Sequence, residues 1–117
     1  MYHCVVFIES RAFTRRLHHL AGKDADDVLR GIQRDLLKDP HSGDVVPGLD
    51  GIRKARATNP RRGKGKRSGY RYMHLYLEHR DHIHLLFLLD KDEQEDLTAE
   101  QRRDLRTLVT ELKRSGR

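Results

Sequence analysis

The spacing of apolar residues divides the first third of the chain into one strand and two helices. Residues 2–8 are β-branched or aromatic and predict a strand. Apolar residues at helical spacing follow twice, first after Ser10 as a helix N-cap and up to Gly22, then from Asp24 to a stop at Pro40. The short turn between them predicts a helical hairpin whose apolar stripe is buried on a sheet.

The middle of the chain changes to strand spacing. A turn-rich stretch, 41–51, leads into a predicted strand at 52–58, where Ile52, Lys54 and Arg56 share one face because side chains alternate. Further strands are predicted at 69–78 and 82–89, joined by a short hairpin connection.

A terminal helix completes the pattern. Thr98 is predicted to cap it, and Gln101 three positions later forms a capping box. The element order βααβββα predicts an α+β fold, with an antiparallel sheet that carries its helices on one face. At 117 residues we expect one domain, residues 1–117.

Composition excludes several classes of protein. No apolar run approaches the roughly 20 residues that cross a bilayer, and the apolar N-terminus is too short for a signal peptide. Cys4 is the only cysteine, so no internal disulfide or cysteine-based metal cluster is expected, and we interpret it as a small buried hydrophobic residue. A cytoplasmic protein without a cofactor is the simplest interpretation.

The positive charge of the chain is concentrated in one block. Of the 24 basic residues, nine lie between positions 53 and 71, without any acidic residue; the rest of the chain has 15 basic and 18 acidic residues, so a net charge of +6 becomes −3. Residues 59–69, rich in glycine and basic residues, predict a mobile basic loop. The block comprises Arg53, Lys54, Arg56, Arg61, Arg62, Lys64, Lys66, Arg67 and Arg71.

Such a block is the electrostatic footprint of a polyanion site. The alternative is a solvated sheet edge whose lysines prevent aggregation. The density of uncompensated charge favours the polyanion site.

Two other groups of side chains have competing interpretations. Tyr70, Tyr72 and Tyr76 share a strand face with His74, which indicates a core face against the helical hairpin more than a stacking platform for bases. His82 and His84 share another face. Without a defined third ligand they predict no metal site, but they could transfer protons near a phosphate.

The motifs of the second half resemble those of the RelE/HigB toxins of bacterial type II toxin–antitoxin pairs. The specific part is GIRKAR from Gly51, then a glycine- and lysine-rich loop, then SGYRY opening a strand. The run LLDKDEQEDLTAEQ before the terminal helix resembles the HigB-like branch.

The resemblance implies a fold, an activity and partners. The fold would be a curved sheet backed by two helices. The activity would be a ribosome-dependent endoribonuclease (an mRNA interferase) that cuts translated mRNA in the A site of the 30S subunit, contacting mRNA and rRNA. The partner would be a cognate antitoxin, in the HigB branch a helix-turn-helix HigA-like protein, and the free toxin would be a monomer.

Metal-free RNA cleavage needs a base for the 2′-OH, charge stabilisation at the phosphate and a proton for the leaving oxygen. Lys54 is our candidate base, because neighbouring cations lower the pKa of a lysine. Arg56 could hold the phosphate in a bidentate fork. The resemblance makes Arg71 the transition-state arginine and Lys91 the late basic residue of the site.

The chain also departs from the RelE pattern. Arg56 stands where RelE has its lysine base, so the role moves to Lys54 or lapses. Thr98 stands at the position of the stacking tyrosine, so stacking falls to Tyr70 or Tyr72 or is absent. The general acid stays unassigned. Backbone contacts to RNA are expected from Arg53, Arg61, Arg62, Lys64, Lys66 and Arg67.

Two other functions compete. The ParE branch shares the fold and poisons DNA gyrase, but it generally lacks clustered cations on the strands. A non-catalytic RNA- or ribosome-binding module would need only the loop at 59–69.

Overall fold

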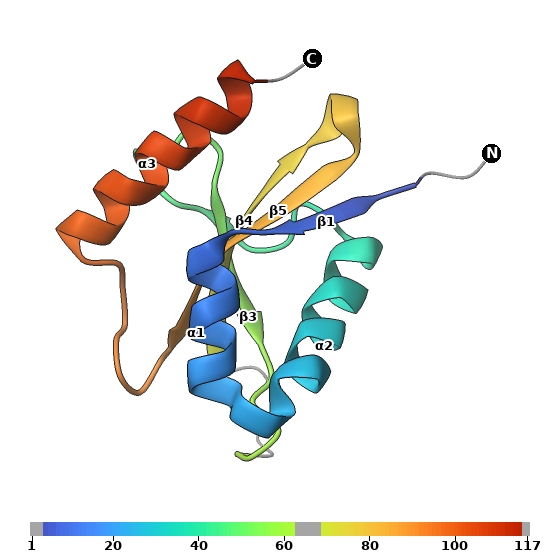
Figure 1. The fold of residues 1–117 in the computed structure, drawn as a ribbon, viewed down its shortest axis with the longest axis vertical. Coiled ribbons are helices and arrows are strands. Elements are labelled where there is room, and N and C mark those ends of the chain that lie inside the picture. Colours follow the sequence, from blue (N-terminus) through green and yellow to red (C-terminus); the bar gives the residue numbers. More distant parts are fainter. Residues whose placement is uncertain (1–3, 63–68, 116–117) are drawn as a thin grey trace.

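The computed structural model describes residues 4–62 and 69–115 (Figure 1). The N-terminal part contains β1 (Val6–Glu9), α1 (Arg11–Ala21), the 3₁₀ turn η1 (Gly22–Asp24) and α2 (Ala25–Lys38). The hydroxyl of Ser10 accepts a 3.0 Å hydrogen bond from the Phe13 amide and caps α1, as predicted. Gly22, with φ of 54°, ends the same helix. The helical hairpin is therefore confirmed.

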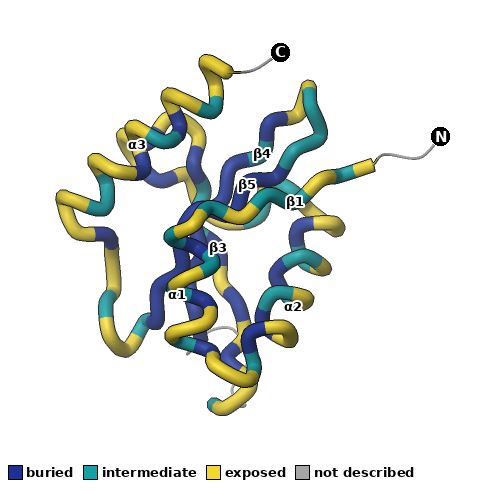
Figure 2. Tube along the Cα trace, viewed as in Figure 1, coloured by how far each residue is buried: buried dark blue, intermediate teal, exposed yellow. Residues whose placement is uncertain are grey.

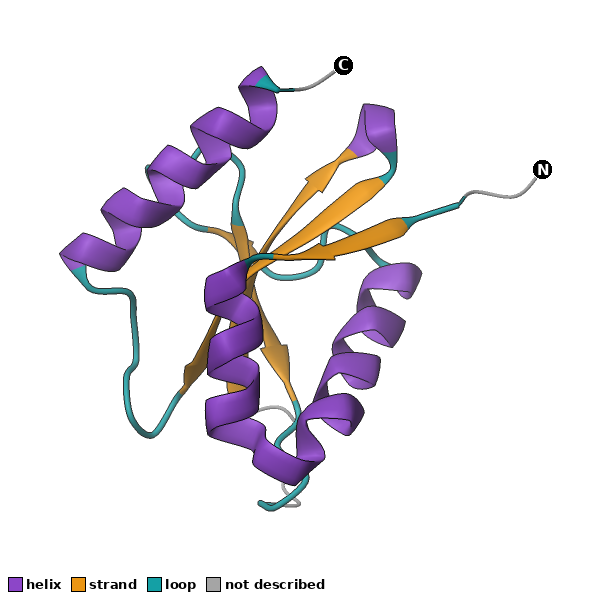
Figure 3. Ribbon diagram, viewed as in Figure 1, coloured by secondary structure: helices purple, strands orange, loops and turns teal. Residues whose placement is uncertain are grey.

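The remaining elements are β2 (Asp44–Val45), β3 (Arg53–Ala57), β4 (Tyr70–Leu77), η3 (Glu78–Arg80), β5 (His82–Asp90) and α3 (Ala99–Arg114) (Figure 3). The short β2 lies inside the stretch that was predicted to be turns. The capping box at the start of α3 is confirmed, since both the Thr98 and the Gln101 hydrogen bonds are present.

The sheet is mixed, with the strand order β1-β5-β4-β3-β2. Strands β2 to β5 pair antiparallel, as predicted, but β1 pairs parallel to β5. The prediction of a wholly antiparallel sheet is wrong at this edge. Because two helices and three strands separate β1 from β5, sequence spacing does not reveal their relative direction.

Helices cover both faces of the sheet, not one as predicted. Side chains of α1 and α2 pack with Tyr70, Tyr72 and Ile83, whereas Leu105 and Val109 of α3 pack with Met73 and other residues of the opposite face. Strand β4 is buried along almost its whole length (Figure 2). An element that is apolar on both faces requires a cover on each side.

A bulge lies in the β4–β5 ladder, where the register shifts between Met73 and His74. A bulge bends a strand and increases its local twist. It separates the part of β4 that leads to the η3 turn from the part that begins at Tyr70.

The N-terminal edge requires one more correction. Cys4 is exposed and does not pack in the core, because it precedes β1 and lies outside the ladder. Within residues 4–62 and 69–115, no helix has the length and apolarity needed to cross a membrane.

Candidate functional site: a cationic face on β3 and β4

The register between β3 and β4 brings three predicted site residues onto one face of the sheet. Arg56 lies directly opposite Arg71, and Lys54 lies opposite Met73. Met73 belongs to the core on the α3 side, while Ala55 and Ala57 belong to the core on the helical-hairpin side. Alternation therefore places Lys54, Arg56 and Arg71 together on the α3 side. We call these three residues the cationic face.

The opposed arginines are an unfavourable arrangement for stability. Directly opposed residues of antiparallel strands have Cβ atoms about 4.5–5.5 Å apart, and like charges there destabilise the sheet. A phosphate placed between Arg56 and Arg71 would relieve this repulsion.

Arg71 is the most deeply placed of the three, at 9% exposed. Burial, followed by the nearby charge of Arg56, lowers the pKa of its guanidinium. One of its nitrogens donates a 3.2 Å hydrogen bond to the carbonyl of Tyr70. A partly dehydrated cation in a fixed position interacts more strongly with an anion than a solvated one does.

Lys54 is positioned by the chain segment before it. Gly43 has φ of 89°, and a Cβ at this position would lie 2.2 Å from the Lys54 carbonyl oxygen. Only glycine permits this approach of the backbone to β3. Lys54 and Arg56 also border a cavity of about 260 Å³ with Asp35, Ser42 and Gly43.

Carboxylates from elsewhere in the chain compensate part of the basic block. The Arg62 guanidinium makes two 3.0 Å hydrogen bonds to the carboxylate of Asp90 and lies 3.2 Å from Asp92. Arg61 lies 3.0 Å from Asp24 and also bonds the carbonyl of Ala21. The basic block contains no acidic residue in the sequence, but the fold brings acidic residues from other segments next to it.

The Asp90 carboxylate is held ionised by this contact. Burial acts to raise its pKa, but hydrogen bonds from Arg62 and from the Asp92 amide outweigh burial and lower it. Asp90 in turn raises the pKa of Arg62. Arg62 thus links the turn after β3 to the end of β5.

The other predicted residues lie at the periphery of the site. The Arg53 side chain bonds the Gly43 carbonyl at 3.0 Å, and its position in β3 puts it on the face opposite Lys54. Lys91 follows Asp90 in the turn after β5, next to the β4 end that carries Arg71. Lys64, Lys66 and Arg67 lie outside the described residues.

The tyrosines form a core face, as predicted. Tyr70 is 1% exposed and Tyr72 fully buried, and both pack with α1 and α2. Burial raises the pKa of both phenols. Base stacking by Tyr70 or Tyr72 is therefore excluded, because neither ring reaches the surface on the cationic side.

His82 and His84 lie with ring centroids 6.1 Å apart. His84 is opposite Leu75, four residues along β4 from Arg71, which corresponds to about 13 Å at 3.3 Å per residue. Burial, then the charges of His82 and Arg80, lowers the pKa of His84. At this distance the pair does not transfer protons at the cationic face. The described residues contain no cluster of three metal-ligating side chains.

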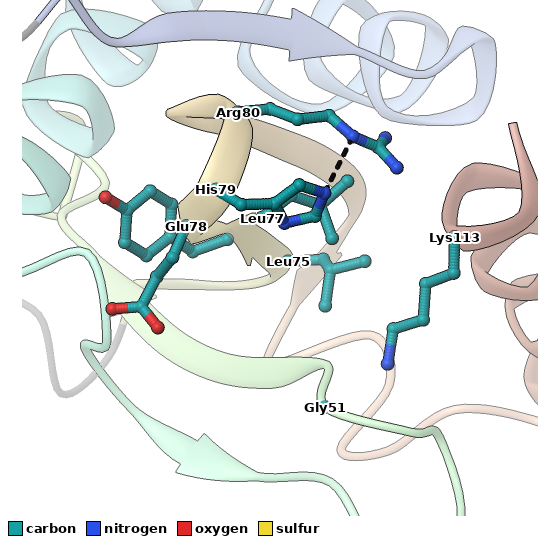
Figure 4. Close-up of a pocket in the computed structure, with 8 residues that line it drawn as sticks. Gly51, Leu75, Leu77, Glu78, His79, Arg80 and Lys113 are labelled. Carbon is teal, nitrogen blue, oxygen red and sulfur yellow. Dashed lines mark hydrogen bonds between the residues drawn. The ribbon is translucent and has the colours of Figure 1, made fainter. Parts of the chain in front are cut away.

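A separate pocket of about 510 Å³ lies between the β4–η3 end and the last turn of α3 (Figure 4). Leu75 and Leu77 line it, with Arg80 on one side and Lys113 on the other (Figure 4). Lys113 is paired with Asp50 at 3.2 Å, and Glu78 also borders the pocket. Its charges are mixed, in contrast to those of the cationic face.

Comparison with known proteins identifies the architecture. No protein-family model matches the sequence. A doubly substituted mutant of the E. coli toxin RelE in the free state matches with a TM-score of 0.55 at 12% identity, over 80% of this chain and 90% of that one. The isolated E. coli RelE toxin matches with a TM-score of 0.54 at 10% identity, over 90% and 99%. The chain has a RelE-like fold. The intact E. coli RelBE toxin–antitoxin complex matches with a TM-score of 0.49 at 11% identity, over 73% and 94%.

At these identities the match to RelE describes the fold, and the site rests on the residues themselves. Sequence reasoning identified the cationic face but missed the acidic residues beside it. Asp96 lies 3.8 Å from the Lys54 ammonium. The run of acidic residues between Asp90 and Thr98 is the feature of the sequence that could have indicated them.

Proposed function

We propose that this protein is the toxin of a type II toxin–antitoxin pair and acts as an endoribonuclease. It would cut mRNA in the A site of the translating ribosome. The observation that carries the proposal is the Arg56–Arg71 opposition, with Lys54 on the same face of a RelE-like sheet. Three cations on one face are suited to binding an RNA phosphate.

In the proposed reaction, the 2′-OH of the nucleotide attacks its own 3′-phosphate. The P–O5′ bond breaks, leaving a 2′,3′-cyclic phosphate and a 5′-OH. Arg71 and Arg56 stabilise the extra negative charge on the phosphate oxygens, an effect often worth about 3 kcal/mol per donor. Lys54 is the candidate base for the 2′-OH, and Lys91 adds positive charge at the β5 end.

The ribosome supplies what this site lacks. Neither Tyr70 nor Tyr72 can stack on a base, so the face has no described aromatic platform to orient an RNA chain. Binding mRNA in the A site would provide that orientation, and orientation contributes strongly to rate. We propose that cleavage depends on the ribosome for this orientation.

The proposed partner is an antitoxin encoded with the toxin, a helix-turn-helix HigA-like protein by the resemblance. A neutralising segment would present acidic side chains to the cationic face. We propose a monomer for the free toxin.

The test is primer extension on mRNA in a reconstituted translation system, with and without ribosomes. Wild type is compared with Lys54→Ala and Arg71→Ala, and Arg103→Ala serves as a control for loss of charge on exposed α3. In-frame cuts that require ribosomes, persist in the control and fall at least tenfold in the two site variants support the proposal. Intact mRNA with translation blocked contradicts the nuclease and leaves a ribosome-binding inhibitor. Intact mRNA with normal translation would favour the alternative that the protein poisons DNA gyrase.

A further inference from the structure

An acidic segment, residues 92–96, lies beside the cationic face. Its four carboxylates belong to Asp92, Glu93, Glu95 and Asp96, and all four residues are exposed. It follows β5 directly and leads into α3.

The acidic segment is held at both ends. The amides of Glu93 and Gln94 each donate a 3.0 Å hydrogen bond to the Asp90 carbonyl. The Gln94 side-chain amide donates to the Asp96 carbonyl at 2.7 Å and to Gln101 at 2.6 Å. Leu97, buried in the core below α3, ends the segment. These hydrogen bonds fix the backbone of the segment between β5 and α3.

Asp96 is the member that contacts the cationic face. Its Oδ1 lies 3.8 Å from the Lys54 Nζ and also accepts a 2.8 Å hydrogen bond from the Leu97 amide. The backbone amide thus holds the carboxylate in place. The Asp96 side chain is 66% exposed and that of Lys54 32%, so water and a competing anion can reach the contact.

A carboxylate oxygen and a phosphate oxygen are both anionic hydrogen-bond acceptors, so either can lie beside an ammonium. We propose that Asp96 weakens the binding of free RNA, because its carboxylate occupies the space beside Lys54 that the RNA backbone would take. This inference rests on the proposed function, in which Lys54 contacts the RNA as the candidate base for the 2′-OH. RNA must displace Asp96, so RNA that is not held by the ribosome binds the face weakly.

Asp92 and Glu95 differ from Asp96 in their contacts. Asp92 approaches Arg62, but Asp90 already holds Arg62 through two hydrogen bonds. Glu95 makes no ion pair with the described residues. Glu95→Gln therefore matches Asp96→Asn in charge change and exposure, and lacks the contact with Lys54.

The experiment measures the affinity of a short single-stranded RNA by fluorescence anisotropy at low salt. The RNA carries 2′-O-methyl groups, so it has no nucleophile and cannot be cut. Asparagine at position 96 keeps an oxygen to accept from the Leu97 amide, so Asp96→Asn preserves the local fold. We expect Asp96→Asn to bind about threefold tighter than Glu95→Gln, or about 0.7 kcal/mol at 1.4 kcal/mol per tenfold.

A second pair of variants tests the mechanism. In a Lys54→Ala background, Asp96→Asn and Glu95→Gln should bind the RNA equally, because the ammonium for which Asp96 and RNA compete is then missing. At high salt the difference between the two single variants should disappear, because exposed charges are screened.

Equal affinities of Asp96→Asn and Glu95→Gln would overturn the inference, because the effect would then be one of overall charge. A difference that persists without Lys54 would overturn it too, as would absence of RNA binding by every variant. Because the RNA is uncleavable, these results are independent of the nuclease. A protein that shows the Asp96 effect but cuts no mRNA on the ribosome keeps the inference and loses the proposed reaction.

Discussion

Arg62 is predicted from the sequence to bind RNA, but its contacts indicate a role in stability. We therefore expect Arg62→Ala to destabilise the protein, whereas Arg56→Ala, on the cationic face, should leave stability nearly unchanged. Arg62 donates two 3.0 Å hydrogen bonds to Asp90, whose side chain is only 12% exposed. Arg56 is exposed and faces a like charge.

The expected loss of stability follows from the Asp90 carboxylate, which loses its Arg62 partner in Arg62→Ala. Removing one partner of a fully buried ion pair costs about 3–5 kcal/mol, and leaving a single buried acceptor unsatisfied costs about 1–3 kcal/mol. The Arg62 side chain is 28% exposed, so water replaces part of the lost contact. We expect a loss of about 2 kcal/mol in the free energy of unfolding, or a fall in Tm of about 8 °C for a chain of this size.

The pH dependence identifies the cause. The folded-state pKa of Asp90 lies below the ordinary value of 3.8 for this side chain. The stabilisation that the Asp90 carboxylate gives the folded state is therefore complete above 3.8 and is lost as pH falls through the folded-state pKa. Urea unfolding should give the full difference between wild type and Arg62→Ala at pH 7, and a progressively smaller one as pH falls through the lowered pKa of Asp90. A loss under 0.5 kcal/mol at pH 7, or an undiminished loss in acid, would show that the Arg62–Asp90 pair does not stabilise the fold in this way.

Two further substitutions test the fold around the site. His84→Leu should stabilise the protein, or leave its stability unchanged, at pH 7, because the buried Nε2 of His84 has no hydrogen-bond partner in the described part of the chain. Since burial lowers the folded pKa of His84, wild type should also lose stability relative to this variant as pH falls below about 6.5, which urea titrations at several pH values would detect. Gly43→Ala should cost at least 2 kcal/mol in urea unfolding, because its Cβ would overlap the Lys54 carbonyl and φ there is 89°; a nearly neutral result would mean that this strand contact is not formed.

Local signals predicted the elements well. Ser10, Gly22 and the Thr98–Gln101 capping box act within a few residues of their own positions, so the sequence contains their whole environment. Strand alternation likewise placed Lys54 with Arg56, and the tyrosines in the core. Their assignment needed no knowledge of the neighbouring strands.

Contacts between distant segments were not predictable in the same way. The pairing of Arg62 with Asp90 spans 28 positions and that of Arg61 with Asp24 spans 37, so charge counting over a window treated both arginines as uncompensated. The parallel pairing of β1 with β5 and the location of α3 depend on how the chain returns to the sheet. Cys4 was assigned to the core from residue type alone, although its location before the ladder leaves it exposed.

We propose that the cationic face cleaves RNA by attack of the 2′-OH. The measurement that tests it most directly is mass spectrometry of the mRNA ends produced on ribosomes by wild type and by Arg71→Lys. We expect a 2′,3′-cyclic phosphate or 3′-phosphate on one fragment and a 5′-OH on the other. Arg71→Lys should form these ends at least tenfold more slowly, because an ammonium cannot reproduce the guanidinium fork. Ends with a 3′-OH and a 5′-phosphate, or equal rates for the two proteins, would contradict it.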